Sequence, residues 1–264
     1  MSTSRSLFFW GSVLVLLGLC FALKAAGVIQ NVWEYFWPLF LLLAGGWLVT
    51  VALLPARATV EGEERVVLNL QGARQANLTV EYGAGQMHIS GGAPADALLT
   101  ANGSSLHVSS RLEGERLTAK VECAPTFVPF LGPESGVWRF RLNNEVPLHL
   151  TVESGASQLT LDLSELQVTY LKLEAGASHV TLTAPARVAN ALLEIEAGAA
   201  SLNVQIPQGV AARVRLDQAI ASFTIDQQRF PLLHPNLYQS VDYDHAPYRV
   251  ELNIEAGVSA VNVA

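Results

Sequence analysis

Acidic residues recur at one position of a repeated phrase and could together form a binding surface. Glu153, Glu174 and Glu196 each precede a small residue and a glycine, and Asp217 keeps the same phase in VRLDQAIASFTI. If the phrases stack as parallel strands about 4.8 Å apart, the four carboxylates form an outer acidic ladder. Like charges at that spacing repel in water by roughly 1 kcal/mol per pair, so the ladder could bind a divalent cation or a basic partner. The alternative is a row of solvated turn residues whose carboxylates accept backbone N–H groups and discourage edge aggregation.

Catalytic chemistry has no comparable signal in the sequence. A phosphate-cradling glycine loop, a nucleophile elbow and a zinc-protease helix are all missing. Cys20 lies in an apolar segment and Cys123 in the predicted β domain, so we do not expect a disulfide, and their spacing is not that of metal ligands. We therefore expect a protein that is not an enzyme and that needs no cofactor or metal.

The ladder residues belong to a sequence repeat, and this repeat predicts the fold of the domain in which they lie. The phrases LTVEYGAGQMHI, LTVESGASQLTL, LKLEAGASHVTL, LEIEAGAASLNV and LNIEAGVSAVNV share one pattern with a period of about 21 residues. Their anchor acids are Glu81, Glu153, Glu174, Glu196 and Glu255, and degenerate copies fall on Asn102 and Glu122. A fixed period with loop insertions indicates a solenoid. A β-sandwich is the alternative, but it would not require such similar phrases at one period.

Each phrase predicts two short strands joined at a corner. Apolar residues lie one and three positions before the acid and six and eight positions after it, so the inward-facing parity changes between the strands. A glycine two residues after the acid is expected to form the corner, because glycine can adopt the positive φ that a bulge there could need. These corner glycines are Gly83, Gly155, Gly176, Gly198 and Gly257.

Two proline- and aromatic-rich segments interrupt the repeat, residues 124–138 and 227–248. Such loops on a rigid scaffold often bind partners, or they cover a sheet edge, and the sequence does not choose between these roles. The expected organisation is a two-helix transmembrane hairpin in residues 1–55, a linker and solenoid start in 56–76, and an all-β parallel solenoid in 77–264.

Two uncharged apolar segments, residues 7–23 and 36–54, precede the repeat. At 1.5 Å per residue they reach about 25 and about 28 Å, close to a hydrocarbon core of about 30 Å, so we expect both to contact the lipid bilayer as spans. A cleaved signal peptide is the alternative for the first segment, but Leu19 stands where a lipobox has a small residue before Cys20. Side chains suited to a membrane interface lie near the span ends: Trp10, Lys24, Trp33, Tyr35 and Trp37.

The β domain is acidic, which excludes some partners. Of the charged residues, Arg5, Lys24 and Glu34 alone precede residue 55, which leaves 14 basic and 22 acidic residues behind it, a net charge of −8. Nucleic acid and anionic headgroups would repel such a domain.

The flanking charges predict the topology of a multi-pass membrane protein. Two spans leave both termini on one side of the cell membrane, and Arg5, Arg57 and Arg65 outnumber Lys24. The positive-inside rule therefore places the β domain in the cytoplasm.

Two stretches resemble known families. WPLFLLLAGGWLV with its preceding apolar segment resembles the LiaI/LiaF-like transmembrane region, and the LxxEAGASxxxL phrase looks like the β domain of cell-wall-active antibiotic response proteins and the related toastrack domains. The resemblance implies a bacterial envelope-stress role, in which the protein senses damage or holds a signalling partner. It offers no catalytic residues.

Three functional hypotheses follow. The first is a non-enzymatic membrane-anchored scaffold or regulator that binds a protein partner through the β-solenoid. The alternative is a solenoid that binds cell-envelope polysaccharide or acts like an adhesin, through the acidic ladder or the insertions. A third is self-association through exposed solenoid ends.

Overall fold

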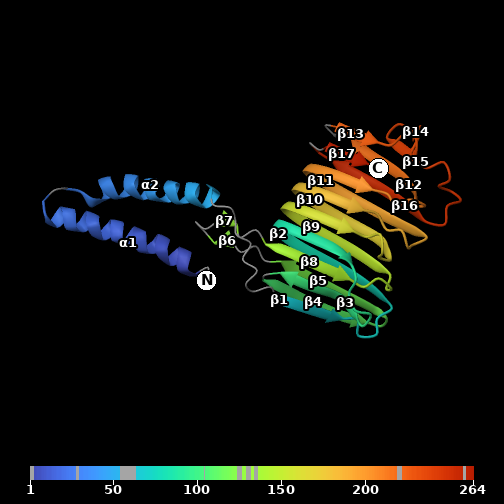
Figure 1. Cartoon of the computed structure of the whole chain (residues 1–264), viewed down its shortest axis with the longest axis horizontal. Helices are drawn as coiled ribbons and strands as arrows, with labels where there is room; N and C mark the ends of the chain where they lie inside the picture. Colours follow the sequence, from blue (N-terminus) through green and yellow to red (C-terminus); the bar gives the residue numbers. More distant parts are fainter. Residues whose placement is uncertain are drawn as a thin grey trace. The chain divides into compact units, whose positions relative to one another are not determined.

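The computed structural model describes residues 3–27, 30–53, 64–103, 105–123, 127–128, 132–133, 136–218, 222–257 and 260–264. The chain forms two compact units, one of residues 1–59 with 126–134 and one of residues 60–125 with 135–264. The first unit contains the helices and the second contains the large sheet (Figure 1).

Two helices, α1 (Thr3–Ala25) and α2 (Val32–Leu53), form most of the first unit. They pack through a small apolar cluster that includes Cys20, Val32 and Phe36. Helix α2 begins at Val32, before the predicted apolar segment, which begins at residue 36. No helix among the described residues combines the length and apolar character that a membrane crossing needs. The structure confirms the two helices but does not support their prediction as membrane spans.

Fifteen described strands form one mixed sheet. They are β1 (Glu64–Asn69), β2 (Gln75–Gly91), β3 (Ala97–Gly103), β4 (Leu106–Glu113), β5 (Arg116–Cys123), β8 (Val137–Leu142), β9 (Leu148–Asp162), β10 (Val168–Thr183), β11 (Asn190–Gln205), β12 (Ala211–Gln218), β13 (Ser222–Ile225), β14 (Leu232–His234), β15 (Leu237–Gln239), β16 (Arg249–Ala256) and β17 (Ala260–Val263). The short strands β6 (Phe127–Val128) and β7 (Gly132–Pro133) pair with each other.

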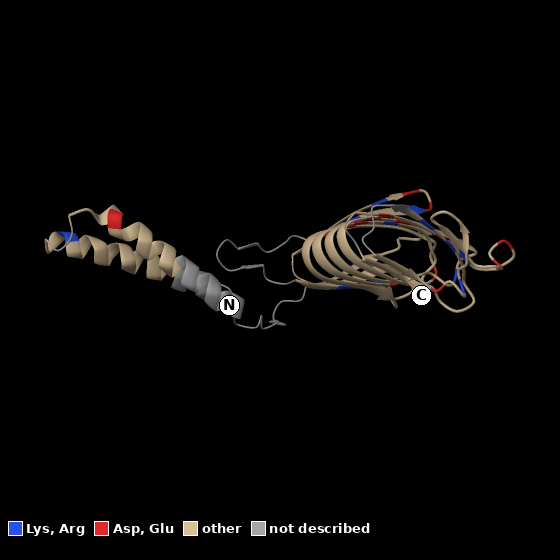
Figure 2. Ribbon diagram, turned by 90° about the horizontal axis from the view of Figure 1, so that it is seen from above, with Lys and Arg blue, Asp and Glu red and all other residues tan. Residues whose placement is uncertain are grey.

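The centre of the sheet is the parallel stack that the repeat predicts. Strands β2, β9, β10 and β11 lie side by side, and equivalent residues of the repeated phrases pair with one another. Figure 2 shows these coils nested one behind another. The sheet as a whole is mixed rather than parallel, because β1, β3, β4, β14 and β15 pair antiparallel.

The core has the predicted periodicity. In β2 the four apolar positions of the phrase, Leu78, Val80, Met87 and Ile89, are each at most 1% exposed. They join one apolar cluster with their counterparts from the other coils. Burying each such side chain contributes about 1.5–3 kcal/mol. Both halves of each repeated strand therefore pack against the same apolar core.

The corner glycines differ from the prediction in their role. Strands β2, β9, β10 and β11 continue through the glycine instead of breaking into two short strands, and Gly155, Gly176, Gly198 and Gly257 do not have positive φ. A Cβ on Gly155 would lie 2.5 Å from the carbonyl oxygen of Gly83, and one on Gly176 would lie 3.0 Å from that of Gly155. Glycine is therefore required by close stacking of successive coils.

The coils do not stack in sequence order. Strands β5 and β8 together flank β2 on the side away from β9. At the other end, β16 pairs with both β11 and β12, so the last coil of the chain lies between two earlier ones. The degenerate copy predicted at Glu122 pairs with Glu81 as expected, but the one at Asn102 is wrong, because β3 pairs antiparallel with β8 and β1.

The two insertions have different structures. In the first, Trp138 belongs to β8 and is 1% exposed, so it is a core residue; residues 124–126, 129–131 and 134–135 lie outside the described residues. In the second, Phe230 is fully buried and β15 pairs antiparallel with β12. The second insertion therefore covers a sheet edge, one of the two roles expected for it.

Candidate functional site

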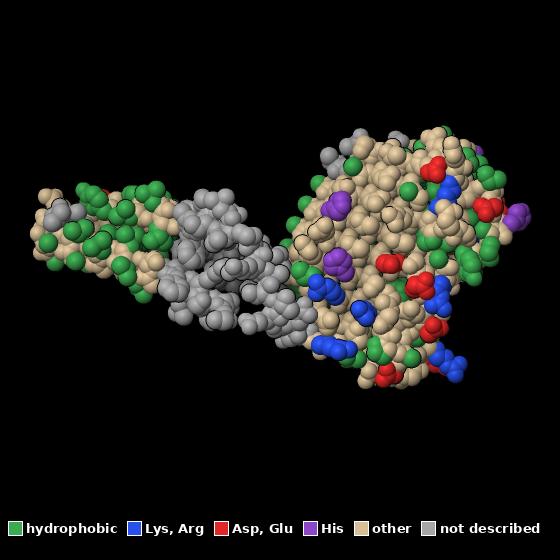
Figure 3. Space-filling model, viewed as in Figure 1, with side chains coloured by type: hydrophobic (Ala, Val, Ile, Leu, Met, Phe, Trp, Pro, Cys, Tyr) green, Lys and Arg blue, Asp and Glu red, His purple; other side chains and the backbone are tan. Residues whose placement is uncertain are grey.

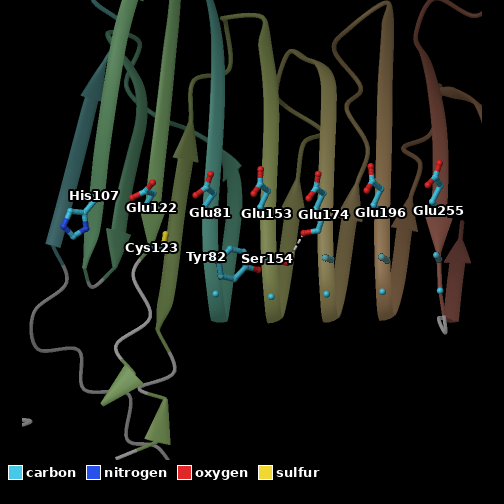
Figure 4. A pocket seen from close by; sticks show the side chains of 18 residues that line it. Glu81, Tyr82, His107, Glu122, Cys123, Glu153, Ser154, Glu174, Glu196 and Glu255 are labelled. Carbon is cyan, nitrogen blue, oxygen red and sulfur yellow. Dashed lines mark hydrogen bonds between the residues drawn. The ribbon is translucent and has the colours of Figure 1, made fainter. Parts of the chain in front are cut away.

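The acidic ladder exists and is longer than predicted. Backbone pairing places the anchor acids in one row across the sheet, in the order Glu122, Glu81, Glu153, Glu174, Glu196, Glu255 and Asp217. Six of these glutamates are seen side by side in Figure 4. Asp217 was expected beside Glu196, but Glu255 lies between them because of the inserted last coil. For Asp217 the structure describes the backbone position alone.

The row borders a groove of about 1070 Å³. Strands β2, β9, β10 and β11 each contribute their glutamate and the next two residues, the second of which is the corner glycine. Strand β16 contributes Glu255 and Ala256, and Gly257 directly follows it. Because these glycines have no side chains, the groove surface beside the carboxylates is formed by backbone and stays open. All five predicted corner glycines thus line the groove, together with His107 of β4 and Cys123 of β5.

Two lysines partly neutralise the row. Lys120 Nζ lies 2.7 Å from a carboxylate oxygen of Glu122 and 2.9 Å from one of Glu81. These hydrogen bonds raise the pKa of Lys120, and Lys120 lowers the pKa of Glu122. Lys172 Nζ lies 2.6 Å from Glu174, and that hydrogen bond raises the pKa of Lys172.

The rest of the row keeps its negative charge. Lys172 is 3.7 Å from Glu196, whereas Glu153 and Glu255 form no ion pair within the described part of the chain. Six glutamates and two lysines give the groove a net charge of about −4 at neutral pH.

Tyr82 lines the same groove, and its hydroxyl is buried without a hydrogen-bond partner among the described residues. Tyr82 is 4% exposed, and its ring packs edge-on against Trp138 with centroids 6.0 Å apart. The Tyr82 hydroxyl bonds to no described atom; Ser154 Oγ instead donates to the Glu174 carbonyl, and Ser157 pairs with Ser178. Burial raises the pKa of Tyr82, and the nearby hydroxyls of Ser157 and Ser154 partly offset this shift. An unsatisfied buried hydroxyl costs about 1–3 kcal/mol.

The carboxylates do not converge as metal ligands would. In the described ranges, no group of three or more His, Cys, Asp or Glu residues is placed to hold a metal ion. Cation ligands surround an ion at about 2.0–2.6 Å, whereas these glutamates stand in a row one strand apart. The geometry thus favours a partner with several positive charges over a single cation.

The predicted membrane-interface residues lie on the helices of the first unit. Trp33, Tyr35 and Trp37 on α2 are each more than half exposed, and Lys24 is in the last turn of α1. The structure describes the helical backbone at Trp10 and not its side chain.

Some groove residues were not singled out from the sequence. Lys120 and Lys172 stand two residues before an anchor acid, the period-two spacing that puts both side chains on one face of a strand, and this signal could have identified them. Tyr82 had no comparable signal, because its position next to the anchor is occupied by small residues in the other strong copies.

The fold and the groove define a class of protein, a β-solenoid with one open acidic groove. The family model described as the N-terminal domain of toast_rack, DUF2154, matches residues 56–207, which is more than half of the chain. The chain belongs to the toast-rack family. The match starts after the segment that resembles the LiaI/LiaF-like region, so that resemblance stays an expectation.

One solved structure has a similar fold. A crystal structure from Clostridium sporogenes, of a "putative cell adhesion protein", has a TM-score of 0.69 at 20% sequence identity and covers 76% of this chain and 97% of its own. At this identity the likeness shows the shared fold. No curated protein matches the chain.

Proposed function

We propose that this protein is a non-enzymatic, envelope-associated interaction protein whose acidic groove binds a basic extended segment of a partner protein. The observation that carries the proposal is the row of six glutamates along the groove, two of which have no ion pair among the described residues. Membership of the toast-rack family and the fold shared with the Clostridium sporogenes protein support a role at the cell envelope. The resemblance of the repeat to antibiotic-response proteins favours a scaffold or regulator of the envelope-stress response.

The groove dimensions indicate the size of the bound segment. Six strands at about 4.8 Å place the outer carboxylates about 24 Å apart, which an extended peptide covers with about seven residues. Alternate side chains of that peptide point to one face, so three or four Lys or Arg residues could face the carboxylates. The affinity should fall with salt, because much of it comes from exposed charges.

A peptide titration tests the proposal. A seven-residue peptide with alternating lysines is added to the full chain, and its fluorescence anisotropy is followed in low and high salt. The variant Glu153→Gln/Glu255→Gln removes the two groove carboxylates without ion pairs and should weaken binding about tenfold, about 1.4 kcal/mol.

A matched control separates the groove from overall charge. Glu145→Gln/Glu165→Gln makes the same charge change on exposed residues outside the groove, so peptide affinity should stay unchanged. Equal losses in the two double variants would mean that the peptide responds to net charge, and the groove proposal would then be abandoned.

We also propose that the helical unit associates with the cell membrane and that the β unit lies in the cytoplasm. Leu14, Val15 and Leu42 are each at least 67% exposed, and water is a costly environment for such a surface. Alkaline carbonate extraction of whole-cell membranes tests the association, and release into the supernatant would count against it.

An impermeant thiol reagent tests on which side of the membrane the β unit lies, with Cys20 and Cys123 replaced and Ser201→Cys introduced. Labelling in intact cells would place the β unit outside.

Polysaccharide binding is a second candidate function, favoured by the other half of the coils. Thr160, Thr181, Asn203 and Asn262 occupy equivalent outward positions on adjacent strands, and Asn262 Nδ2 donates to Asn203 Oδ1 at 2.9 Å. Such an uncharged row of donors and acceptors suits sugar hydroxyls. A glycan array should then show binding that Asn203→Ala weakens, whereas an inert array removes this candidate.

A further inference from the structure

A basic surface stands out on the otherwise acidic β unit. We call it the arginine face: Arg65 of β1 and Arg139 and Arg141 of β8, with His88 of β2 beside them. All four side chains are exposed. Figure 3 shows basic side chains gathered beside histidines on one face of this unit.

Strand pairing places these residues on one outer surface. One row across the sheet is His88, Arg139, Asn102 and Arg65, and the next is Ser90, Arg141, Thr100 and Val67. None of the eight positions is acidic. Arg65 and Arg141 form no ion pair with any described residue, so these two arginines contribute a charge of about +2 to the face.

The arginine face matches the acidic groove in charge and spacing. The groove carries about −4, and its carboxylates repeat at about 4.8 Å. Arg139 and Arg65 lie two strands apart, about 9.6 Å, which is the separation of every second carboxylate in the groove. Guanidinium groups suit this contact because they donate fork-like pairs of hydrogen bonds to carboxylates.

We propose that the arginine face of one copy of the chain docks on the acidic groove of a second copy. The inference rests on the proposed function, since it uses the groove as the receiving surface and names one of its partners. The groove borders the first half of the coils and the arginine face includes the second half of β2, and both halves turn their inner sides to one core. Their outer faces therefore point in different directions, so a docked pair leaves one groove and one arginine face free. Such a heterologous contact forms a closed ring or an open series, depending on the rotation between neighbouring copies.

Charge reversal on each surface tests the contact. Sedimentation velocity of the full chain in a non-ionic detergent should show concentration-dependent oligomers at about 0.01 M salt that dissociate at about 1 M, where the Debye length is about 3 Å. Arg65→Glu/Arg141→Glu makes both surfaces acidic, and Glu153→Lys/Glu255→Lys brings the charge of the groove to about zero. Each double variant alone should sediment as the high-salt species.

An equimolar mixture of the two double variants should associate again, because each supplies the charge that the other lacks. This recovery requires folded surfaces, so it distinguishes lost contacts from a variant that fails to fold. Association that persists in both single preparations, or a mixture that stays dissociated, would overturn the proposal. A wild-type chain that binds the lysine peptide but never associates would overturn this inference while leaving the proposed function intact. Binding of inorganic polyphosphate to the arginine face without self-association would assign that face to another partner.

Discussion

The glycine stack allows a graded prediction within one structural row. Each glycine meets the carbonyl oxygen of the glycine on the neighbouring coil, but the clearance differs: an added Cβ would lie 2.5 Å from this oxygen at Gly155 and 3.2 Å at Gly198. Gly155→Ala and Gly198→Ala are thus the same chemical change made against different free space. We expect the first to destabilise the fold much more than the second.

The magnitudes follow from the clearances. Ordinary contact for a Cβ begins at 3.4 Å, so the coils must separate by about 0.9 Å at Gly155 and by about 0.2 Å at Gly198. Overpacking of a rigid interior costs about 1–3 kcal/mol and occasionally more, and the obstacle at Gly155 is the backbone carbonyl of Gly83, which cannot rotate away as a side chain could. Replacing glycine within a strand also gains up to about 1 kcal/mol from lower conformational entropy of the unfolded chain. We therefore expect a loss of about 3 kcal/mol for Gly155→Ala and a change within about 1 kcal/mol for Gly198→Ala.

Urea unfolding of the full chain, followed by circular dichroism of the sheet, measures both free energies of unfolding. Equal slopes against urea would show that both variants unfold from the same compact state. If Gly198→Ala cost as much as Gly155→Ala, clearance between coils could not be the reason for glycine at these positions.

Three further predictions use the same chain. Trp138→Ala should lose about 3–5 kcal/mol of stability in urea, because the side chain is 1% exposed, and a smaller loss would place it outside the core. Burial raises the pKa of Cys123 to about 12, so in a Cys20→Ser background a thiol reagent at neutral pH should label it after unfolding and leave the folded protein unlabelled. Lys120 holds the pKa of Glu122 below its ordinary value of 4.5 in the folded state; that stabilisation is therefore present above pH 4.5 and lost as the pH falls through the folded value. The difference in urea midpoint between the wild type and Lys120→Met should accordingly shrink at low pH, and a difference independent of pH would contradict the ion pair.

Local pattern was enough to predict much of the fold. The alternation that places Leu78 and Val80 before the acid and Met87 and Ile89 after it is a consequence of strand geometry, and all four are buried as expected. Parallel pairing of equivalent phrases follows because a shift of one residue would turn every apolar side chain outward. The ladder of Glu153, Glu174 and Glu196 depends on this register alone.

The order of the coils could not be predicted from the same pattern. Strands with similar sequences can pair equally well with one another. The pattern therefore fixes the register of a pair, but it does not fix which strand lies beside which. Connections such as residues 206–210 and 227–248 decide it, and they carry no periodic signal. For that reason Glu255 was missed as the neighbour of Glu196.

Features that depend on three-dimensional packing were also missed. The glycine positions were recognised, but the need for glycine was attributed to a positive φ. The true reason is the close approach between coils, which cannot be detected within a single repeated phrase. The unpaired hydroxyl of Tyr82 likewise results from where Ser154 and Ser157 donate or share their own hydrogen bonds.

The position of β16 and β17 has a consequence for how the chain is made. Residues 249–263 are synthesised after the strands on both sides of them, because β16 lies between β11 and β12 and β17 lies between β11 and β13. During synthesis, the coils up to β11 can form in order from the start of the chain, while β12 waits without its parallel neighbour. This end of the domain is therefore completed only after residues 249–263 have left the ribosome, and a nascent chain that stops short of residue 249 keeps an unfilled position between β11 and β12 for any extended segment with the same alternation.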